Sequence, residues 1–442
     1  MLRTIDLRGR ALSTPELLAA VPRATAARDE ALTVAARIVQ DVAARGEEAL
    51  REQAAQFDNV QGHDIRVPQH HLDEALGGLD RAVRAALEEA IRRVREASAA
   101  QIPPVRVTEL GAGARVEQRW RPAERVGVYV PGGKAVYPSS VVMNVVPAQV
   151  AGVTHVVLAS PPQAEFAGRV HPVILAAARL LGVEEVYAMG GAGAIGAYAY
   201  GVPGLGLERV DVISGPGNNF VALAKRVVAG VVGTDSEAGA TEILVVADAS
   251  ADADWVAADL VSQAEHDEQA AAVLVTDSAE LADAVATRVA ARAATTRYAD
   301  RVAAALGGPQ SAIVLVDDIA AATAFSNAYA PEHLELHLDG LELGDPRVDA
   351  FVNAGAVFVG GHSPVSLGDY LAGSNHVLPT GGQARYAAGL SASTFLRPQQ
   401  IIAYDRAALA DVQEGIVALA TAEALPAHGE AVVARFAQDG AR

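Results

Sequence analysis

The feature that most constrains the fold is an alternation of short apolar runs with alanine-rich helical segments that begins after Pro103 and Pro104. The runs form two series, 126–130, 156–159, 186–189 and 210–213, then 243–246, 272–275, 313–316 and 357–359. A strand, helix, strand order at this spacing predicts right-handed crossovers and parallel sheets that are covered on both faces. We therefore expect an α/β protein with two open α/β domains.

The length of the chain also favours more than one domain. Its 442 residues are 51% hydrophobic, which is enough for a large buried core. Helical spacing of apolar residues across 26–55 and 82–101 predicts long amphipathic helices before the alternation. We expect a tail at 1–25, one domain at 107–241, a discontinuous domain at 26–106 and 242–389, and a C-terminal tail at 390–442. That last tail is too small to hold a core alone, so it is expected to pack on another domain or a second subunit.

Composition excludes several classes of function. The formal net charge is -18, which argues against a nucleic-acid partner because phosphate contacts need clustered Lys and Arg. Cysteine is absent, so disulfides, thiolate zinc sites, iron-sulfur clusters and cysteine nucleophiles are excluded. No run is long and apolar enough to span a membrane, and residues 1–11 do not resemble a secretion signal. We expect a soluble cytoplasmic protein.

Two glycine-rich turns follow expected strands of the first series. Val130-Pro131-Gly132-Gly133-Lys134 leads to a helix start, and Gly215-Pro216-Gly217-Asn218 opens another helix. Ligands of open parallel sheets bind at this edge, and helix N-termini attract phosphates, so the turns suit a nucleotide. Neither matches the G-x-G-x-x-G fingerprint, and ordinary tight turns explain them equally well.

A candidate metal site begins at Gln263 and His266. Their spacing of one helical turn predicts that both side chains lie on one helix face. With Asp369 and His428 they would supply two imidazoles, a carboxylate and an amide oxygen, a set suited to zinc or manganese. Two of the four residues are distant in the sequence, so packing or surface roles remain an alternative.

Glu332 and His333 form a second candidate pair, before an apparent strand at 334–338. At a strand entry both side chains could line one pocket, where an imidazole accepts a proton near neutral pH and a carboxylate activates water. The alternative is a charged residue that caps a loop or helix end.

Six blocks of the sequence resemble sequence blocks of the histidinol dehydrogenase family. They are 127–133, 137–144, 215–218, 263–267, 330–334 and 374–380, and the resemblance extends in matching order over nearly the whole chain. It implies two Rossmann-like open parallel-sheet domains of the aldehyde-dehydrogenase-like kind. It also implies an NAD-dependent zinc enzyme that oxidises L-histidinol to L-histidine through an aldehyde, in two steps, as the last step of histidine biosynthesis. The family resembled is homodimeric.

The resemblance also implies roles for single residues. Zinc would be held by Gln263, His266, Asp369 and His428, with His428 from the partner subunit, and these four residues would also contact the substrate. His333 would accept the alcohol proton and Glu332 would activate water for the second oxidation. The substrate pocket would include Thr241, His333, His376 and Glu423. The NAD-binding domain, 107–241, would contact the cofactor through Tyr129, Gly193 and Asn218.

Three positions depart from the pattern of the family resembled. Gly193 stands where a glutamine that contacts NAD is usual, Ala240-Thr241 replaces Pro-Ser, and Glu423-Ala424-Leu425 replaces Glu-Gly-Leu. Thr241 keeps a hydroxyl and Glu423 keeps its carboxylate. Two rivals are a family member that oxidises another polyol or amino alcohol, and a non-catalytic zinc- or nucleotide-binding relative. Glu423 and His376 argue against the first, and Glu332 with His333 against the second.

Overall fold

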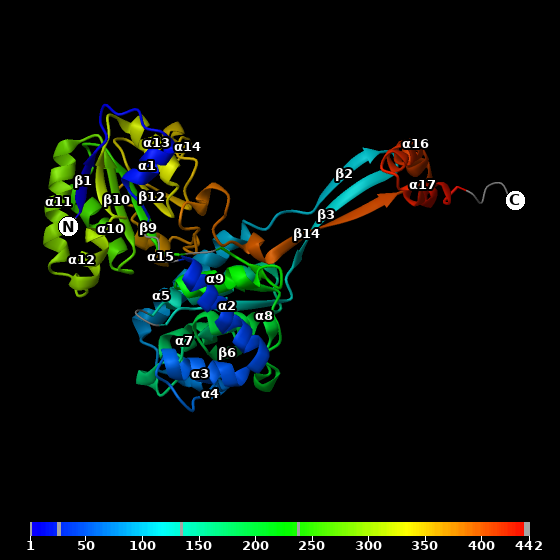
Figure 1. Ribbon diagram of the computed structural model, residues 1–442, viewed down its shortest axis with the longest axis horizontal. Helices are drawn as coiled ribbons and strands as arrows, with labels where there is room; N and C mark the ends of the chain where they lie inside the picture. Colours follow the sequence, from blue (N-terminus) through cyan, green and yellow to red (C-terminus); the bar gives the residue numbers. More distant parts are fainter. Residues whose placement is uncertain (1, 24–27, 133–135, 237–238, 437–442) are drawn as a thin grey trace. The chain divides into compact units, whose positions relative to one another are not determined.

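The computed structural model describes residues 2–23, 28–132, 136–236 and 239–436, which form two compact units. Unit 1 comprises Met1–Gln101 and Ala123–Phe395, and unit 2 comprises Ile102–Pro122 and Leu396–Arg442, each within the described residues. Unit 1 contains two parallel sheets, which confirms the predicted α/β class (Figure 1). No helix within the described ranges is both long and apolar enough to cross a membrane.

The first sheet of unit 1 has six parallel strands in the order β1-β11-β10-β9-β12-β13. Both faces are buried, because alternate residues of β9 point into two different hydrophobic cores. Helices α10, α11, α12 and α15 cover one face, and α1, α13 and α14 cover the other. The strands are β1 (Arg3–Asp6), β9 (Glu242–Ala247), β10 (Ala271–Thr276), β11 (Ala312–Leu315), β12 (His333–His337) and β13 (Ala356–Val359). The helices are α1 (Thr14–Ala20), α10 (Ala253–Ala264), α11 (Ala279–Ala293), α12 (Ala299–Gly307), α13 (Ile319–Tyr329), α14 (Pro346–Asp349) and α15 (Val365–Tyr370).

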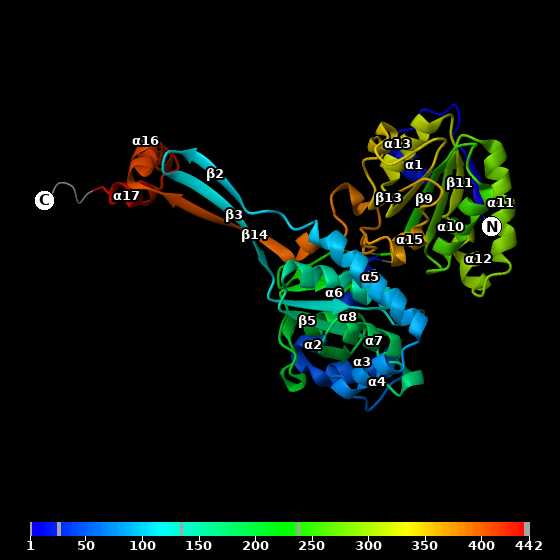
Figure 2. The same ribbon diagram turned by 180° about the vertical axis from the view of Figure 1, so that it is seen from behind.

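The second sheet has five parallel strands in the order β6-β5-β4-β7-β8. Helices α2, α3, α8 and α9 build the core on one face, while α6 packs on β4 and β5 and contacts α5 and α7 (Figure 2). The strands are β4 (Arg125–Tyr129), β5 (His155–Ser160), β6 (Glu185–Ala188), β7 (Val212–Ser214) and β8 (Gly233–Thr234). The helices are α2 (Arg28–Arg45), α3 (Glu47–Phe57), α4 (Gln69–Gly77), α5 (Arg81–Ala99), α6 (Pro138–Ala151), α7 (Pro172–Leu180), α8 (Gly191–Tyr200) and α9 (Asn219–Val228).

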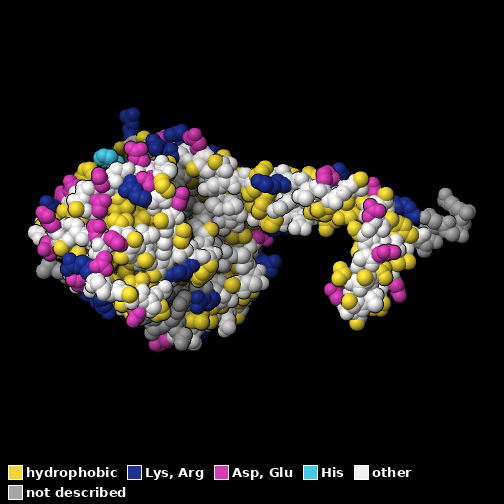
Figure 3. Space-filling model, turned by 90° about the horizontal axis from the view of Figure 1, so that it is seen from above, with side chains coloured by type: hydrophobic (Ala, Val, Ile, Leu, Met, Phe, Trp, Pro, Cys, Tyr) yellow, Lys and Arg dark blue, Asp and Glu magenta, His cyan; other side chains and the backbone are white. Residues whose placement is uncertain are grey.

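Unit 2 is an antiparallel sheet of order β14-β3-β2 followed by two helices. Its elements are β2 (Arg106–Gly111), β3 (Ala114–Pro122), β14 (Leu396–Tyr404), α16 (Arg406–Ala422) and α17 (Pro426–Val433). Hydrophobic side chains are visible over its surface in Figure 3. Among the described residues of unit 2, five large hydrophobic side chains are more than half exposed, namely Val105, Val107, Leu110, Ile402 and Leu419.

The structure distributes several segments differently from the expected boundaries. The helices of 26–106 pack mainly around the five-stranded sheet, because α2 contacts α8 and α9, and α5 contacts α6. The expected N-terminal tail contains β1, which pairs with β11 at the edge of the six-stranded sheet. Strands β2 and β3 belong with the C-terminal segment, since β3 pairs with β14 along its whole length.

Candidate active site

A cavity of about 1660 Å³ in unit 1 collects most of the predicted site residues. The wall that contains the predicted cofactor residues is built from turns that follow β4, β6 and β7, at the carboxyl edge of the five-stranded sheet. Its opposite wall contains Thr241 and Glu332, which directly precede β9 and β12, together with His333, the first residue of β12. The six-stranded sheet therefore contributes its amino edge to the cavity.

The predicted cofactor residues Tyr129, Gly193 and Asn218 all line this cavity. The backbone N–H of Gly191 donates to the Tyr129 hydroxyl at 3.1 Å, and burial raises the pKa of Tyr129 to about 12, so the phenol is neutral. Asn218 caps α9 by accepting from the backbone N–H of Val221 at 3.1 Å. Gly133 and Lys134 of the first glycine turn lie outside the described residues.

The turn at Gly215 is held by the buried ion pair of Lys225 and Asp235. Gly215 has φ of 119°, and a Cβ there would lie 2.0 Å from the backbone oxygen of Tyr129, so only glycine fits. Lys225 donates through Nζ to the backbone oxygen of Gly215 and to Asp235, both at 2.5 Å. Asp235 in turn accepts from the Gly215 N–H at 2.8 Å. These contacts fix the turn against the end of β4.

Glu332 is buried and accepts two hydrogen bonds on one carboxylate oxygen. The Thr241 hydroxyl donates to Oε2 at 2.5 Å and the Glu242 backbone N–H donates to it at 2.8 Å. Burial nevertheless raises the pKa of Glu332 to about 8, and the charge of nearby Glu242 adds to this effect. Arg23 compensates Glu242, with Nε 2.5 Å from Oε1, while its guanidinium lies over the Tyr329 ring.

His333 is buried beside Glu332, with Nδ1 3.5 Å from Glu332 Oε2. Nδ1 also lies 3.0 Å from the backbone oxygen of Glu242, a contact that fits an Nδ1–H donor. Burial lowers the pKa of His333 below its ordinary value. A neutral ring with a protonated Nδ1 leaves Nε2 as the atom that can accept a proton.

Gln263, His266 and Asp369 offer a donor set that fits zinc. The Gln263 amide donates through Nε2 to the Thr241 hydroxyl at 2.7 Å, which leaves its carbonyl oxygen as a ligand. His266 Nδ1 is 3.3 Å from the Gln263 backbone oxygen, so Nε2 is the ring nitrogen available. Asp369 on α15 lines the cavity with His266 and His376. An amide oxygen, an imidazole and a carboxylate are a borderline set of the kind zinc accepts.

The expectation that Gln263 and His266 share one helix face was wrong in detail. Helix α10 ends at Ala264, and His266 lies in the turn beyond it. The pair is nevertheless close, because the His266 backbone N–H donates to the Gln263 oxygen at 3.2 Å. The turn, rather than helical periodicity, brings the His266 ring against the backbone of Gln263.

His376 lies beside Asp369 in the cavity. Its Nδ1 is 3.0 Å from the Asp369 backbone oxygen and its Nε2 is 3.5 Å from the Ser140 hydroxyl. Glu423 and His428 belong to unit 2, where Glu423 follows α16, His428 lies on α17 and both are exposed. The residues described as lining the cavity of unit 1 include neither.

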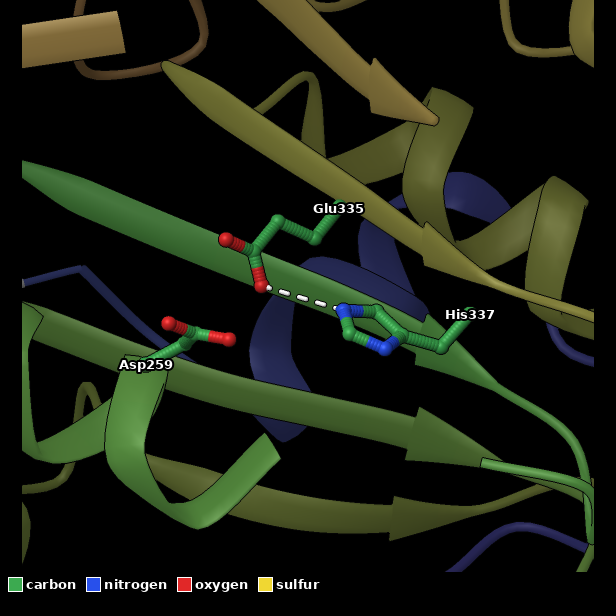
Figure 4. Close-up of side chains that lie close together, drawn as sticks. All are labelled: Asp259, Glu335 and His337. Carbon is green, nitrogen blue, oxygen red and sulfur yellow. Dashed lines mark ion pairs between the residues drawn. The ribbon is translucent and has the colours of Figure 1, made fainter. Parts of the chain in front are cut away.

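Sequence reasoning missed a cluster of three ionisable side chains near His333, of which Glu335 and His337 are buried and Asp259 is half-buried. Asp259 of α10 lies beside Glu335 and His337, which alternate with His333 along β12 (Figure 4). Potential ligand atoms of the three side chains lie within 4.8 Å of one another, so they could hold a metal ion. They also join three elements, because Glu335 accepts from the Val365 N–H at the start of α15 at 2.7 Å. Polar residues at alternating positions of a buried strand were the available signal.

Comparison with known proteins gives consistent results. A sequence model of the family described as histidinol dehydrogenase matches residues 21–436. The chain is 63% identical to a histidinol dehydrogenase of Leifsonia xyli over 435 residues, 98% of this chain and 99% of that one. It is 56% identical to one of Mycobacterium tuberculosis over 440 residues, 99% and 98% of the two chains. The crystal structure of histidinol dehydrogenase from Elizabethkingia anophelis is similar, with a TM-score of 0.91 at 32% identity and coverage of 99% and 98%.

From the cluster of Asp259, Glu335 and His337 we predict that Glu335→Gln changes the pH dependence of the stability of the fold. Burial and the neighbouring charge of Glu335 raise the pKa of Asp259 to about 7, above its value in the unfolded chain. Asp259 therefore stabilises the fold most at low pH, and this contribution is lost as pH rises through about 7. Removing the Glu335 charge should reduce the loss, so the variant should gain stability relative to the parent between pH 5 and 8. Urea unfolding of the variant and the parent at each pH measures this difference in the free energy of unfolding.

The exposed Glu342→Gln serves as the matched control and should follow the parent at every pH. Stability curves of the parent and the Glu335→Gln variant that run parallel from pH 5 to 8 would contradict the interaction.

Proposed function

Because this chain belongs to the histidinol dehydrogenase family, we propose that it oxidises L-histidinol to L-histidine with zinc and two NAD+. This reaction is the last step of histidine biosynthesis and passes through L-histidinal. The observation that carries the proposal is the convergence of Glu332, His333, His266 and Asp369 on the cavity that Tyr129 and Asn218 also line. One cavity can then hold substrate, metal and cofactor together.

The metal site is proposed as Gln263, His266 and Asp369, with His428 from a second copy of the chain. When bound, zinc supplies a fixed positive charge that orients the substrate rather than a nucleophilic water. Thr241 links the metal and catalytic groups, because it accepts from the Gln263 amide and donates to Glu332. His376 and Glu423 are proposed to complete the substrate pocket, Glu423 through the substrate amino group.

In the first oxidation, His333 is proposed to accept the alcohol proton at Nε2. Burial keeps the ring neutral and the Glu242 backbone oxygen fixes Nδ1, so the accepting nitrogen is preset. NAD+ is proposed to lie on Tyr129, Gly193 and Asn218, where it would supply the hydride acceptor. Gly193 offers no side chain to the cofactor.

In the second oxidation, Glu332 is proposed to accept a proton from the water that attacks the aldehyde. The chain has no cysteine, so a thiohemiacetal cannot form and the aldehyde must be hydrated instead. The pKa of Glu332 is about 8, so the carboxyl group is largely protonated at pH 7 and the step should accelerate as pH rises towards 8. The group therefore acts as a base best under mildly alkaline conditions.

A homodimer is proposed because His428 and Glu423 lie on unit 2. Unit 2 exposes an apolar surface that a second chain would cover. It comprises five side chains that are each more than half exposed, Val105, Val107, Leu110, Ile402 and Leu419. Strand β2 is exposed along its whole length.

The function is tested by NADH production from L-histidinol. The expected yield is two NADH for each histidinol, with loss of the signal after chelation and recovery after zinc is restored. Simple diols such as a sulfonated propanediol are the control substrates and should give far lower rates. NADH production that survives chelation, or a preference for the diol, would overturn the proposal.

Glu332→Gln should separate the two oxidations. The variant lacks the base for water attack, so oxidation of supplied L-histidinal should fall by about 100-fold or more, while formation of histidinal from histidinol should fall much less. Single-turnover NADH formation from each substrate measures the two steps. Equal losses in both steps would refute the assignment of Glu332.

Mixed dimers test whether His428 acts across subunits. Glu332→Gln and His428→Ala should each form little histidine alone. A mixed dimer restores one complete site, so random mixing after dissociation should recover about a quarter of the parent activity. A mixture as inactive as its components would place His428 and Glu332 of one chain in the same site.

A further inference from the structure

Gly193 lies under the side chain of Gln53, a residue to which the sequence assigns no role. Gly193 is buried near the start of α8, and Gln53 belongs to α3. A Cβ placed on Gly193 would lie 2.0 Å from Oε1 and 3.2 Å from Cδ of Gln53. The carboxamide of Gln53 therefore occupies the space in which a side chain at position 193 would begin.

Close packing of helices does not explain this glycine, as Gly196 on the same helix shows. A Cβ on Gly196 would meet the backbone of Val39 at 3.2 Å, so there the helices themselves approach closely. At Gly193 the nearest atoms instead belong to the far end of a flexible side chain, followed by Leu50 Cδ2 at 3.4 Å. The glycine accommodates a carboxamide rather than a neighbouring backbone.

The Gln53 carboxamide faces the cavity and is available to a ligand. Gln53 and Gly193 both line the cavity, on the wall that also contains Tyr129. The side chain is half-buried, and within the described residues no hydrogen bond engages its amide. A carboxamide offers two N–H donors and one acceptor oxygen, and a dinucleotide presents partners for both. Nearby lining residues, Leu50 and Ala54, are apolar and cannot replace it.

We propose that Gln53 is a cofactor-binding residue that contacts the dinucleotide from the place left open by Gly193. The proposal rests on the proposed NAD-dependent function. It assigns a cofactor contact to α3, and it makes residues 53 and 193 an interdependent pair because a side chain at position 193 would displace the Gln53 carboxamide. Helix α3 supplies the carboxamide of Gln53 at a point where α8 has only Gly193 and therefore no side chain.

Binding of NADH to the zinc-loaded protein, measured by fluorescence titration without histidinol, tests the proposal. Gln53→Ala should weaken binding about two- to tenfold, the effect of losing one or two neutral hydrogen bonds. Gln56→Ala is the matched control, because Gln56 is exposed on the same helix and does not line the cavity. It should bind NADH like the parent. Histidinol binding without nucleotide should be unchanged in both variants.

Gly193→Ala provides an independent variant that keeps Gln53. The added methyl group must displace the carboxamide, so binding should weaken to the same extent, while alanine favours the helix. The double variant Gln53→Ala with Gly193→Ala should show no further loss, because the contact is already absent.

The outcomes separate this proposal from the proposed function. A parent protein that binds no NADH would overturn both. Parent-like binding by Gln53→Ala, or additive losses in the double variant, would overturn the role of Gln53 alone and leave NAD dependence in place.

Discussion

The candidate site depends on burying ionisable side chains along one face of β12. His333, Glu335 and His337 alternate on that face, while Leu334 and Leu336 fill the hydrophobic core on the other. Burying such groups is costly unless each finds a partner. The partners are Asp259 of α10, the Val365 N–H at the start of α15 and the Glu242 backbone oxygen at the start of β9. Helices α10 and α15 also carry the proposed metal ligands Gln263 and Asp369. The need to provide partners for the buried ionisable side chains of β12 therefore also positions the candidate site.

Much of the fold was predictable because its signals are local. The short apolar runs of both sheets became strands, since buried parallel strands read as continuous apolar segments. Strand β1 was missed because Arg3–Asp6 is short and polar, and its place is set by pairing with β11. Strands β2 and β3 were missed for a related reason. Strand β2 pairs only with β3, and β3 pairs with β14 from Leu396↔Pro122 to Tyr404↔Ala114, a long-range pairing that no local pattern reveals.

The candidate site was predictable only in part. Residue types and the family resemblance singled out Glu332, His333 and Asp369, and the structure brings these residues to one cavity. The group of Asp259, Glu335 and His337 was visible only in part, because the sequence shows the alternating polar residues of β12 but not that Asp259 of α10 lies beside them. Gln53 was equally hidden, since its relation to Gly193 is a contact between two helices that are distant in sequence.

The two sheets of unit 1 face the cavity with opposite edges, the five-stranded sheet with its carboxyl edge and the six-stranded sheet with its amino edge. The loops at the carboxyl edge of the six-stranded sheet, at 248–252, 277–278 and 316–318, consequently contribute no lining to the cavity. Lengthening a surface loop adds little closure entropy, and no residue of these loops lines the cavity. These loops are therefore the natural places in unit 1 to attach a label, a tag or a surface anchor.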